Sequence, residues 1–217
     1  MGLNRRLRPL SAANISKLPE FCQGCVFWES AEPLEVLCGS SCDPEAARRW
    51  YLDVSSEWGE CGRIALEGDE ALGFIKYAPF RFLPQSANLP GASPKDDDVL
   101  LACMHIRSEA RNLGLGTLLL RAALKDIASR GERAVYAYAT TDTRHLEKQP
   151  MISANFLLHN GFTIMHPHPH YPLLRLELKS LALLTENFES VLSSLRIPLR
   201  QRMRMPSPSI ESRGIQE

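Results

Sequence analysis

The amino-acid sequence predicts one α/β (α+β) domain around a mixed central sheet, and three patterns carry this prediction. Val99 to Ile106 form a continuous apolar run of strand length, which is typical of a central strand covered on both faces. Residues 115–128 then place apolar side chains at helical spacing, and Ala134 to Thr140 follow as another short strand. A strand, a crossover helix and a strand in this order indicate a right-handed parallel or mixed arrangement.

The first third of the chain supplies further elements. Arg5 to Leu10 are expected to form a first strand, after which Ser11 is a candidate cap for a helix that runs toward Glu20. Asp43-Pro44-Glu45 is a helix start with Asp at the cap and Pro at the first helical position, so we expect a helix to about Trp58.

A hairpin and a long connection come next. Arg63 to Glu67 and Ala71 to Tyr77 alternate like paired strands around the polar turn Glu67-Gly68-Asp69-Glu70. The four prolines between Pro79 and Asp98 predict a long connection without regular structure.

The end of the chain contains shorter elements. We expect a helix over Met151 to Asn160 and strands at about Thr163 to His166 and Leu173 to Leu178. Residues 181–197 carry apolar side chains at helical spacing and predict a C-terminal helix, whereas residues 198–217 are expected to be disordered.

The turn Arg111-Asn112-Leu113-Gly114-Leu115-Gly116-Thr117 lies between the apolar strand and the helix. Two glycines at this spacing let backbone amides close around an anion at the positive end of a helix. A dinucleotide fold needs a third glycine where this chain has Leu119, and a Walker loop needs a lysine before Thr117. Both nucleotide families are therefore disfavoured.

Taken together, these segments resemble the GNAT superfamily of acyl-CoA-dependent N-acetyltransferases over about Asn4 to Lys179, within a domain expected at residues 1–180. Arg111, Gly114 and Gly116 match its pyrophosphate-binding motif, Ile106 matches the end of its fourth strand, and Gly161-Phe162 match the residues after its last helix. Cys25 to Glu29 and His168 to Leu176 resemble a bacterial branch of unsettled substrate. The resemblance implies a mixed, mostly antiparallel sheet that splays at the acyl-CoA site, with flanking helices.

The implied reaction is direct attack of an amine, on a small molecule or a protein, on the thioester of acetyl-CoA. Backbone amides of the fourth strand would hold the pantetheine arm and polarise the carbonyl, and the glycine turn would hold the pyrophosphate. The donor-binding residues expected from the resemblance are Met104, His105, Ile106, Arg111, Asn112, Leu113, Gly114, Leu115, Gly116 and Thr117.

The catalytic groups are less well specified. Many relatives carry a Tyr four residues before the Gly of Gly-Phe as the general acid, and this chain has Leu157 there. Tyr138, with Tyr136 on the same face, is a candidate substitute, and water is another. His105 is the first candidate for the general base and Glu29 the second. A catalytically weak CoA-binding module for regulation or interaction therefore stays open as an alternative.

Cysteines and histidines leave further alternatives. Cys22, Cys25, Cys38 and Cys42 have a spacing that a zinc site could use, but Phe27 and Trp28 between them look like core, which favours reduced thiols or a redox pair at Cys22 and Cys25. No metal is expected. The alternating His166, His168 and His170 favour an acceptor-pocket wall or a plain loop over a metal site.

Composition sets the remaining expectations. The 217 residues are 44% hydrophobic and 23% charged with no net charge, so the chain can bury one core and has no global attraction to nucleic acid. No apolar run approaches the length of a membrane helix, and the N-terminal sequence lacks the hydrophobic core of a signal peptide. We therefore expect a cytoplasmic protein. Homodimerisation stays open.

Overall fold

The computed structural model describes residues 5–33, 35–36, 41–91, 94–142, 144 and 148–178. Its strands form one sheet in the order β1-β2-β3-β4-β5-β8-β7, with β6 pairing on β5. The strands are β1 (Arg5–Pro9), β2 (Gly62–Glu67), β3 (Glu70–Pro79), β4 (Val99–Ile106), β5 (Ala134–Thr140), β6 (Ile152–Ser153), β7 (Thr163–His166) and β8 (Leu173–Glu177). Among these strands β4 runs parallel to β5 and β5 to β6, and the other pairs are antiparallel, which confirms the mixed sheet.

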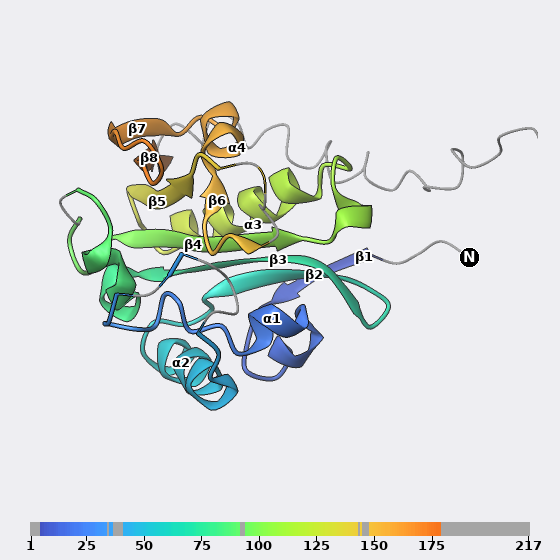
Figure 1. Ribbon diagram of the computed structural model, residues 1–217. Helices are drawn as coiled ribbons and strands as arrows, with labels where there is room; N and C mark the ends of the chain where they lie inside the picture. Colours follow the sequence, from blue (N-terminus) through green and yellow to red (C-terminus); the bar gives the residue numbers. More distant parts are fainter. Residues whose placement is uncertain are drawn as a thin grey trace, which may run out of the picture.

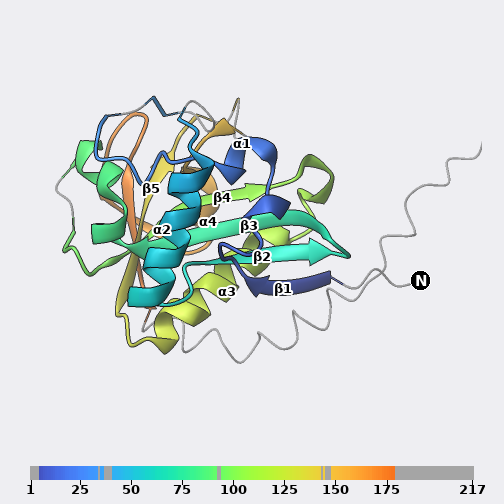
Figure 2. The ribbon, with the colours of Figure 1, turned by 90° about the horizontal axis from the view of Figure 1, so that it is seen from below.

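Helices cover both faces of this sheet. The short α1 (Glu20–Gln23) and α2 (Pro44–Glu57) lie on one face, and α3 (Leu115–Ser129) and α4 (Ala154–His159) lie on the other (Figure 1). Seen from below, α2 crosses in front of the strands (Figure 2). A separate apolar core fills each face, one including Trp28, Trp50 and Tyr51, the other including Tyr77 and Leu119.

The two long helices begin as their sequences predict. The Asp43 carboxylate accepts hydrogen bonds from the backbone N–H groups of Glu45 and Ala46, and Pro44 occupies the first turn of α2. Gly114 precedes α3 with φ 77°, a left-handed conformation that glycine adopts without strain. This left-handed turn aims the start of α3 at the end of β4.

The prediction of a helix from Ser11 to Glu20 was wrong. This segment contains only a 3₁₀ turn at Ile15–Lys17, and α1 begins after Pro19. Leu18 is extended, with φ −67° and ψ 161°, because the residue before a proline is driven out of the helical region. The proline-rich connection also differs in detail, since it contains 3₁₀ turns at Phe80–Phe82 and Pro84–Asn88.

The sheet opens between β4 and β5. Parallel pairing joins Val99 to Val135 and Leu100 to Tyr136, and no further pair is formed between these strands in the described chain. Beyond this point β6 pairs with the end of β5, at Ala139 and Thr140, so the expected helix from Met151 begins as a strand and becomes helical only at Ala154. The predicted C-terminal helix and disordered tail lie outside the described residues.

Candidate active site

The connection from β4 to α3 presents backbone amides rather than side chains. Asn112 and Gly114 both have positive φ, 59° and 77°, and the N-cap at Gly114 makes no side-chain cap hydrogen bond. The first N–H groups of an α-helix have no partner within the helix. The loop and the start of α3 can therefore donate to an anion placed before the helix.

A cavity of about 340 Å³ lies against this turn and the second half of β4. It contains every expected donor-binding residue except Leu113. Sequence reasoning missed the opposite side, because no local pattern shows that β6 and α4 close this space. The residues that line it are Met104, His105, Ile106, Ala110, Arg111, Asn112, Gly114, Leu115, Gly116, Thr117, Met151, Ile152, Ser153 and Phe156.

Two contacts shape the cavity around the glycine turn. A Cβ atom added at Gly116 would lie 3.2 Å from Ile106 Cδ1 and 3.3 Å from Phe156, closer than most real Cβ contacts. The exposed Arg111 turns its side chain back, so that Nε donates to the carbonyl oxygen of Ile106 at 3.1 Å. Arg111 thus ties the loop to the end of β4, one of the two roles expected for it.

His105 lies on the α1–α2 face of β4. Its ring contacts Phe21 edge-on at a centroid distance of 5.2 Å, and Phe74 on β3 at 6.3 Å. The residue also belongs to the wall of a second cavity, of about 20 Å³, which has Met104 and His105 in common with the first. His105 therefore stands where the two cavities meet.

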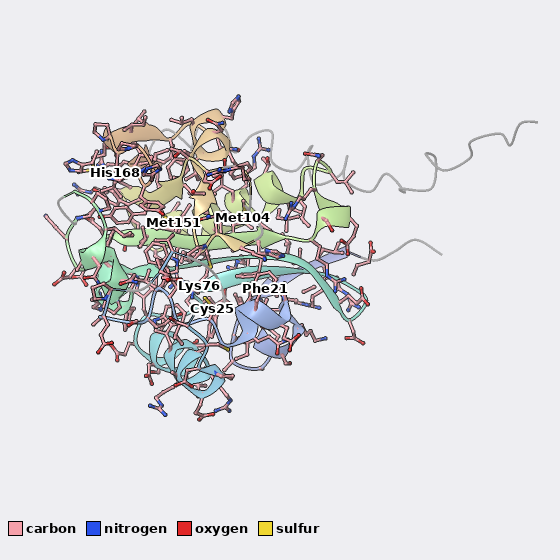
Figure 3. All side chains as sticks on the ribbon, viewed as in Figure 1. Phe21, Cys25, Lys76, Met104, Met151 and His168 are labelled. Carbon is pink, nitrogen blue, oxygen red and sulfur yellow. The ribbon has the colours of Figure 1, made fainter. Side chains whose placement is uncertain are left out.

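A buried ion pair adjoins the small cavity. Lys76 Nζ donates to Glu29 Oε1 at 2.6 Å and lies 5.0 Å from the centre of the Trp50 ring; the two side chains are 6% and 8% exposed. Burial alone would lower the pKa of Lys76, but the Glu29 charge and neighbouring thiols and Tyr51 hold it well above its usual value. Lys76 is therefore charged at neutral pH. In the side-chain view Lys76 and Cys25 lie together on the α1–α2 side of the sheet (Figure 3).

The other proposed catalytic side chains are placed differently. Tyr138 is fully buried in the α2-side core, and the neighbouring Tyr136 accepts a hydrogen bond from Arg175 through its hydroxyl. Neither tyrosine is among the residues that line the two cavities. Leu157 is also fully buried, whereas Ser153, four residues earlier at the end of β6, lines the larger cavity.

The cysteines do not form a metal site in the described part of the chain. Cys22, Cys25 and Cys103 line the small cavity, and Cys42 is exposed and pairs with Cys25 through the backbone. The described residues include no group of three or more His, Cys, Asp or Glu arranged to hold a metal ion. Cys38 lies outside those residues, so the alternative of a zinc site at the four cysteines is not tested.

The predicted histidine wall is a structured turn between β7 and β8. His168 Nδ1 accepts hydrogen bonds from the backbone N–H groups of His170 at 3.2 Å and Tyr171 at 3.0 Å. Thr141 anchors the turn through its hydroxyl to the Pro169 carbonyl oxygen. His168 and His170 are therefore part of a loop that packs beside the end of β5.

Within the described ranges no helix has the length and apolar character needed to cross a membrane.

Comparisons with known proteins identify a family from the sequence and a shared fold from solved structures. Residues 26–149 match the model of the Acetyltransferase (GNAT) family. Similar structures include an acetyltransferase of the GNAT family from Streptococcus pneumoniae, 14% identical with a TM-score of 0.55, covering 80% of this chain and 99% of that one. The GNATL loading domain of CurA from Lyngbya majuscula is 16% identical with a TM-score of 0.54, covering 82% and 99%. YncA of Salmonella typhimurium, with its cofactor acetyl-CoA, is 14% identical with a TM-score of 0.54, covering 80% and 94%. No match is found among curated protein sequences.

Proposed function

The chain belongs to the GNAT family of acetyltransferases, and from that premise we propose that it transfers the acetyl group of acetyl-CoA to an amine of a small molecule or protein. One observation carries the proposal: the cavity of about 340 Å³ extends from the second half of β4, which pairs with β3 but not with β5, to the start of α3. That geometry suits a long donor with a pyrophosphate at one end and an acyl group at the other. The solved neighbour YncA holds acetyl-CoA on the same fold.

Each end of the donor has its own protein groups. Amides from Asn112 to Thr117 would bind the pyrophosphate at the start of α3. Amides of residues 104–106 would bind the pantetheine arm and polarise the thioester carbonyl. Their hydrogen bonds to the carbonyl oxygen would strengthen as negative charge develops on it in the transition state. Arg111 supports this through the shape of the loop, because its guanidinium is already bonded to Ile106.

The transfer needs one base and one proton donor. The amine nitrogen bonds to the carbonyl carbon, the carbon–sulfur bond breaks, the nitrogen loses a proton, and the CoA thiolate gains one. We assign the base to His105, because it lies where both cavities meet. Glu29 has one oxygen engaged by Lys76, so we assign it a positioning role. Ser153 lines the larger cavity, and its hydroxyl is our candidate to hydrogen-bond the thiolate in place of the family tyrosine.

The donor site is tested by Gly114→Asp, with acetyl-CoA affinity measured by calorimetry. A carboxylate at this position would repel the pyrophosphate, so we expect affinity to fall by about 100-fold or more. Gly68→Asp is the matched control, because Gly68 also has positive φ, 61°, and nothing lies within 4 Å of an added Cβ. Retained affinity in a folded Gly114→Asp protein would refute the site.

The enzyme and the binding module differ in turnover. Release of free CoA with an amine panel, above the rate of thioester hydrolysis, supports the transferase. Acetyl-CoA binding without amine-dependent release supports the regulatory module instead. Substitution Ser153→Ala is expected to lower kcat about tenfold and leave donor affinity unchanged, since the hydroxyl acts on the leaving group.

A further inference from the structure

Cys25 and Cys42 lie directly opposite each other in an isolated antiparallel bridge just before α2. The backbone N–H of Val26 donates to the carbonyl oxygen of Ser41 at 3.1 Å, and a second bond of 2.7 Å joins the residues on the other side of the bridge. These bonds flank the two cysteines, which therefore form a non-hydrogen-bonded pair. Residues in such a pair have Cα atoms about 4.5 Å apart, within the range of about 4.4–6.8 Å found in disulfides.

The side chains of this pair carry accessible thiols. Cys42 is exposed and Cys25 is half-buried. The Cys42 sulfur lies beside Gly24, where an added Cβ would be 2.7 Å from it, and Cys25 lines the small cavity. Because the backbone spacing already suits a disulfide, rotation about the two Cα–Cβ bonds is the movement needed to bring the sulfur atoms together.

The charge beside Cys25 favours its reactive form. Burial opposes the charge on Lys76, yet Glu29 and nearby groups that include Cys25 hold the pKa of Lys76 well above its usual value. The same attraction stabilises a Cys25 thiolate, the form of cysteine that reacts with disulfides. By contrast, burial raises the pKa of Cys61 and of Cys103 to about 12, so these two thiols stay uncharged near neutral pH.

We propose that Cys25 and Cys42 form a reversible disulfide by exchange with a low-molecular-weight disulfide, independently of the proposed acetyl transfer. The exposed Cys42 thiolate attacks one sulfur of the reagent, the S–S bond of the reagent breaks, and one thiolate leaves. Cys25 then attacks the Cys42 sulfur, the mixed disulfide breaks, and the second thiolate leaves. The protein thiols lose two electrons and their two protons, and the reagent gains both as two free thiols.

The new bond would close the segment that carries Trp28 and Glu29 into the core. Trp28 is buried and donates from Nε1 to the carbonyl oxygen of Pro150 at 2.7 Å, and Glu29 pairs with Lys76 on β3. A disulfide stabilises a fold chiefly because it restricts the unfolded chain, and the effect grows with the length of the loop. For a loop of about 17 residues in a chain of this size, we expect Tm to rise by about 5–10 °C.

The test treats the full chain with oxidised glutathione and measures its mass without reduction, and its Tm. We expect each chain to lose two hydrogen atoms and Tm to rise by about 5–10 °C, with both changes reversed by dithiothreitol. Cys42→Ser should remove both changes, and Cys25→Ser should instead retain glutathione on Cys42. Cys22→Ser is the matched control, because the Cys22 carbonyl oxygen accepts from the N–H of Cys25 at 3.4 Å, and it should keep both changes.

The contrary outcomes are equally specific. An unmodified protein that loses no hydrogen, or an intrachain disulfide that persists in folded Cys42→Ser, would overturn the proposal. A disulfide that is lost in Cys22→Ser or in Cys38→Ser would belong to another pair of cysteines and would overturn it as well. A disulfide that leaves Tm unchanged or lowers it would show that the native backbone does not suit the bond. None of these measurements involves acetyl-CoA, so their failure is separate from a failure of the proposed function.

Discussion

Two charge clusters, one partly buried and one buried, lie on opposite faces of the same sheet, and each contains one of two adjacent β3 residues, Tyr77 and Lys76. Tyr77 points to the α3 face, where its hydroxyl donates to Asp126 Oδ2 at 2.7 Å. Arg63 and Arg130 also donate to Asp126, at 2.8 and 2.7 Å, so both carboxylate oxygens are paired. Lys76 points to the α2 face, where Glu29 has one oxygen paired and one orphaned.

The difference separates a structural role from a functional one. Arg130 also covers Trp58 at 4.0 Å from its ring centre and donates to the carbonyl oxygens of Trp58 and Glu60, so the Asp126 cluster joins α3 to the chain before β2. No cavity described above includes its residues. The Lys76 cluster adjoins a cavity and retains unpaired acceptors. We infer that the Asp126 cluster, whose acceptors are all hydrogen-bonded, stabilises the fold, and that the Lys76 cluster, which keeps an unpaired acceptor, serves a ligand.

The largest expected effect is at the Asp126 cluster, in which both carboxylate oxygens are hydrogen-bonded. Asp126→Ala leaves Tyr77, Arg63 and Arg130 without their shared acceptor, so the free energy of unfolding should fall by about 4 kcal/mol. Urea unfolding measures the loss, and acetyl-CoA affinity should change less than about twofold. Asp69→Ala is the control: this carboxylate pairs with Lys17 but is 99% exposed, and its loss should leave stability unchanged. Equal losses for both variants would contradict the structural role.

Variants of the Lys76–Glu29 pair should change stability and turnover independently. Lys76→Met leaves the Glu29 carboxylate buried without its cation and should cost about 3 kcal/mol of unfolding free energy. Adding Glu29→Leu removes the stranded charge and should recover most of that loss. Turnover with an amine acceptor should not recover, because the small cavity beside His105 has lost the charged Lys76 from its wall. Recovery of both properties in the double variant would assign this pair a purely structural role.

A smaller effect concerns the thiols of the α2 face at alkaline pH. Burial raises the pKa of Cys61 and of Cys103 from 9.0 to about 12. Above pH 9 the unfolded chain ionises these thiols and the folded chain does not, so stability is full below pH 9 and falls as pH rises toward 12. By about pH 10.5 each thiol should account for a loss of about 2 kcal/mol. Cys103→Ala should therefore lose about 2 kcal/mol less than the unmodified protein between about pH 8 and pH 10.5, and equal losses would argue against the burial.

Much of the fold could be predicted because its signals are local. The proline and aspartate at the start of α2, the glycines around α3 and the apolar run of β4 each act through neighbouring residues. The failure between Ser11 and Glu20 is also local, because Pro19 forces Leu18 out of the helical region. The turn before α3 could be predicted for the same reason, because its glycines lie in one short segment.

The walls of the small cavity could not be predicted in this way. Glu29 and Lys76 are far apart in the sequence and meet only through the packing of the segment before α2 on β3. Gln149 lines the small cavity and Ser153 lines the larger one, because β6 pairs with β5 beyond the end of the β4–β5 ladder. A strand of two residues carries no periodic signal, so this pairing could not be predicted. Tyr138 was favoured by its alternation with Tyr136, but alternation places both rings on the packed face.

Hydrogen exchange of backbone amides with and without acetyl-CoA tests the central assignment most directly. We expect added protection at residues 104–106 and 112–117, where the amides would bind the donor, and unchanged exchange around Asp126. Gly68→Asp should give the same pattern, and Gly114→Asp should remove it. Protection that appears elsewhere, with residues 112–117 unaffected, would contradict the placement of acetyl-CoA between β4 and α3.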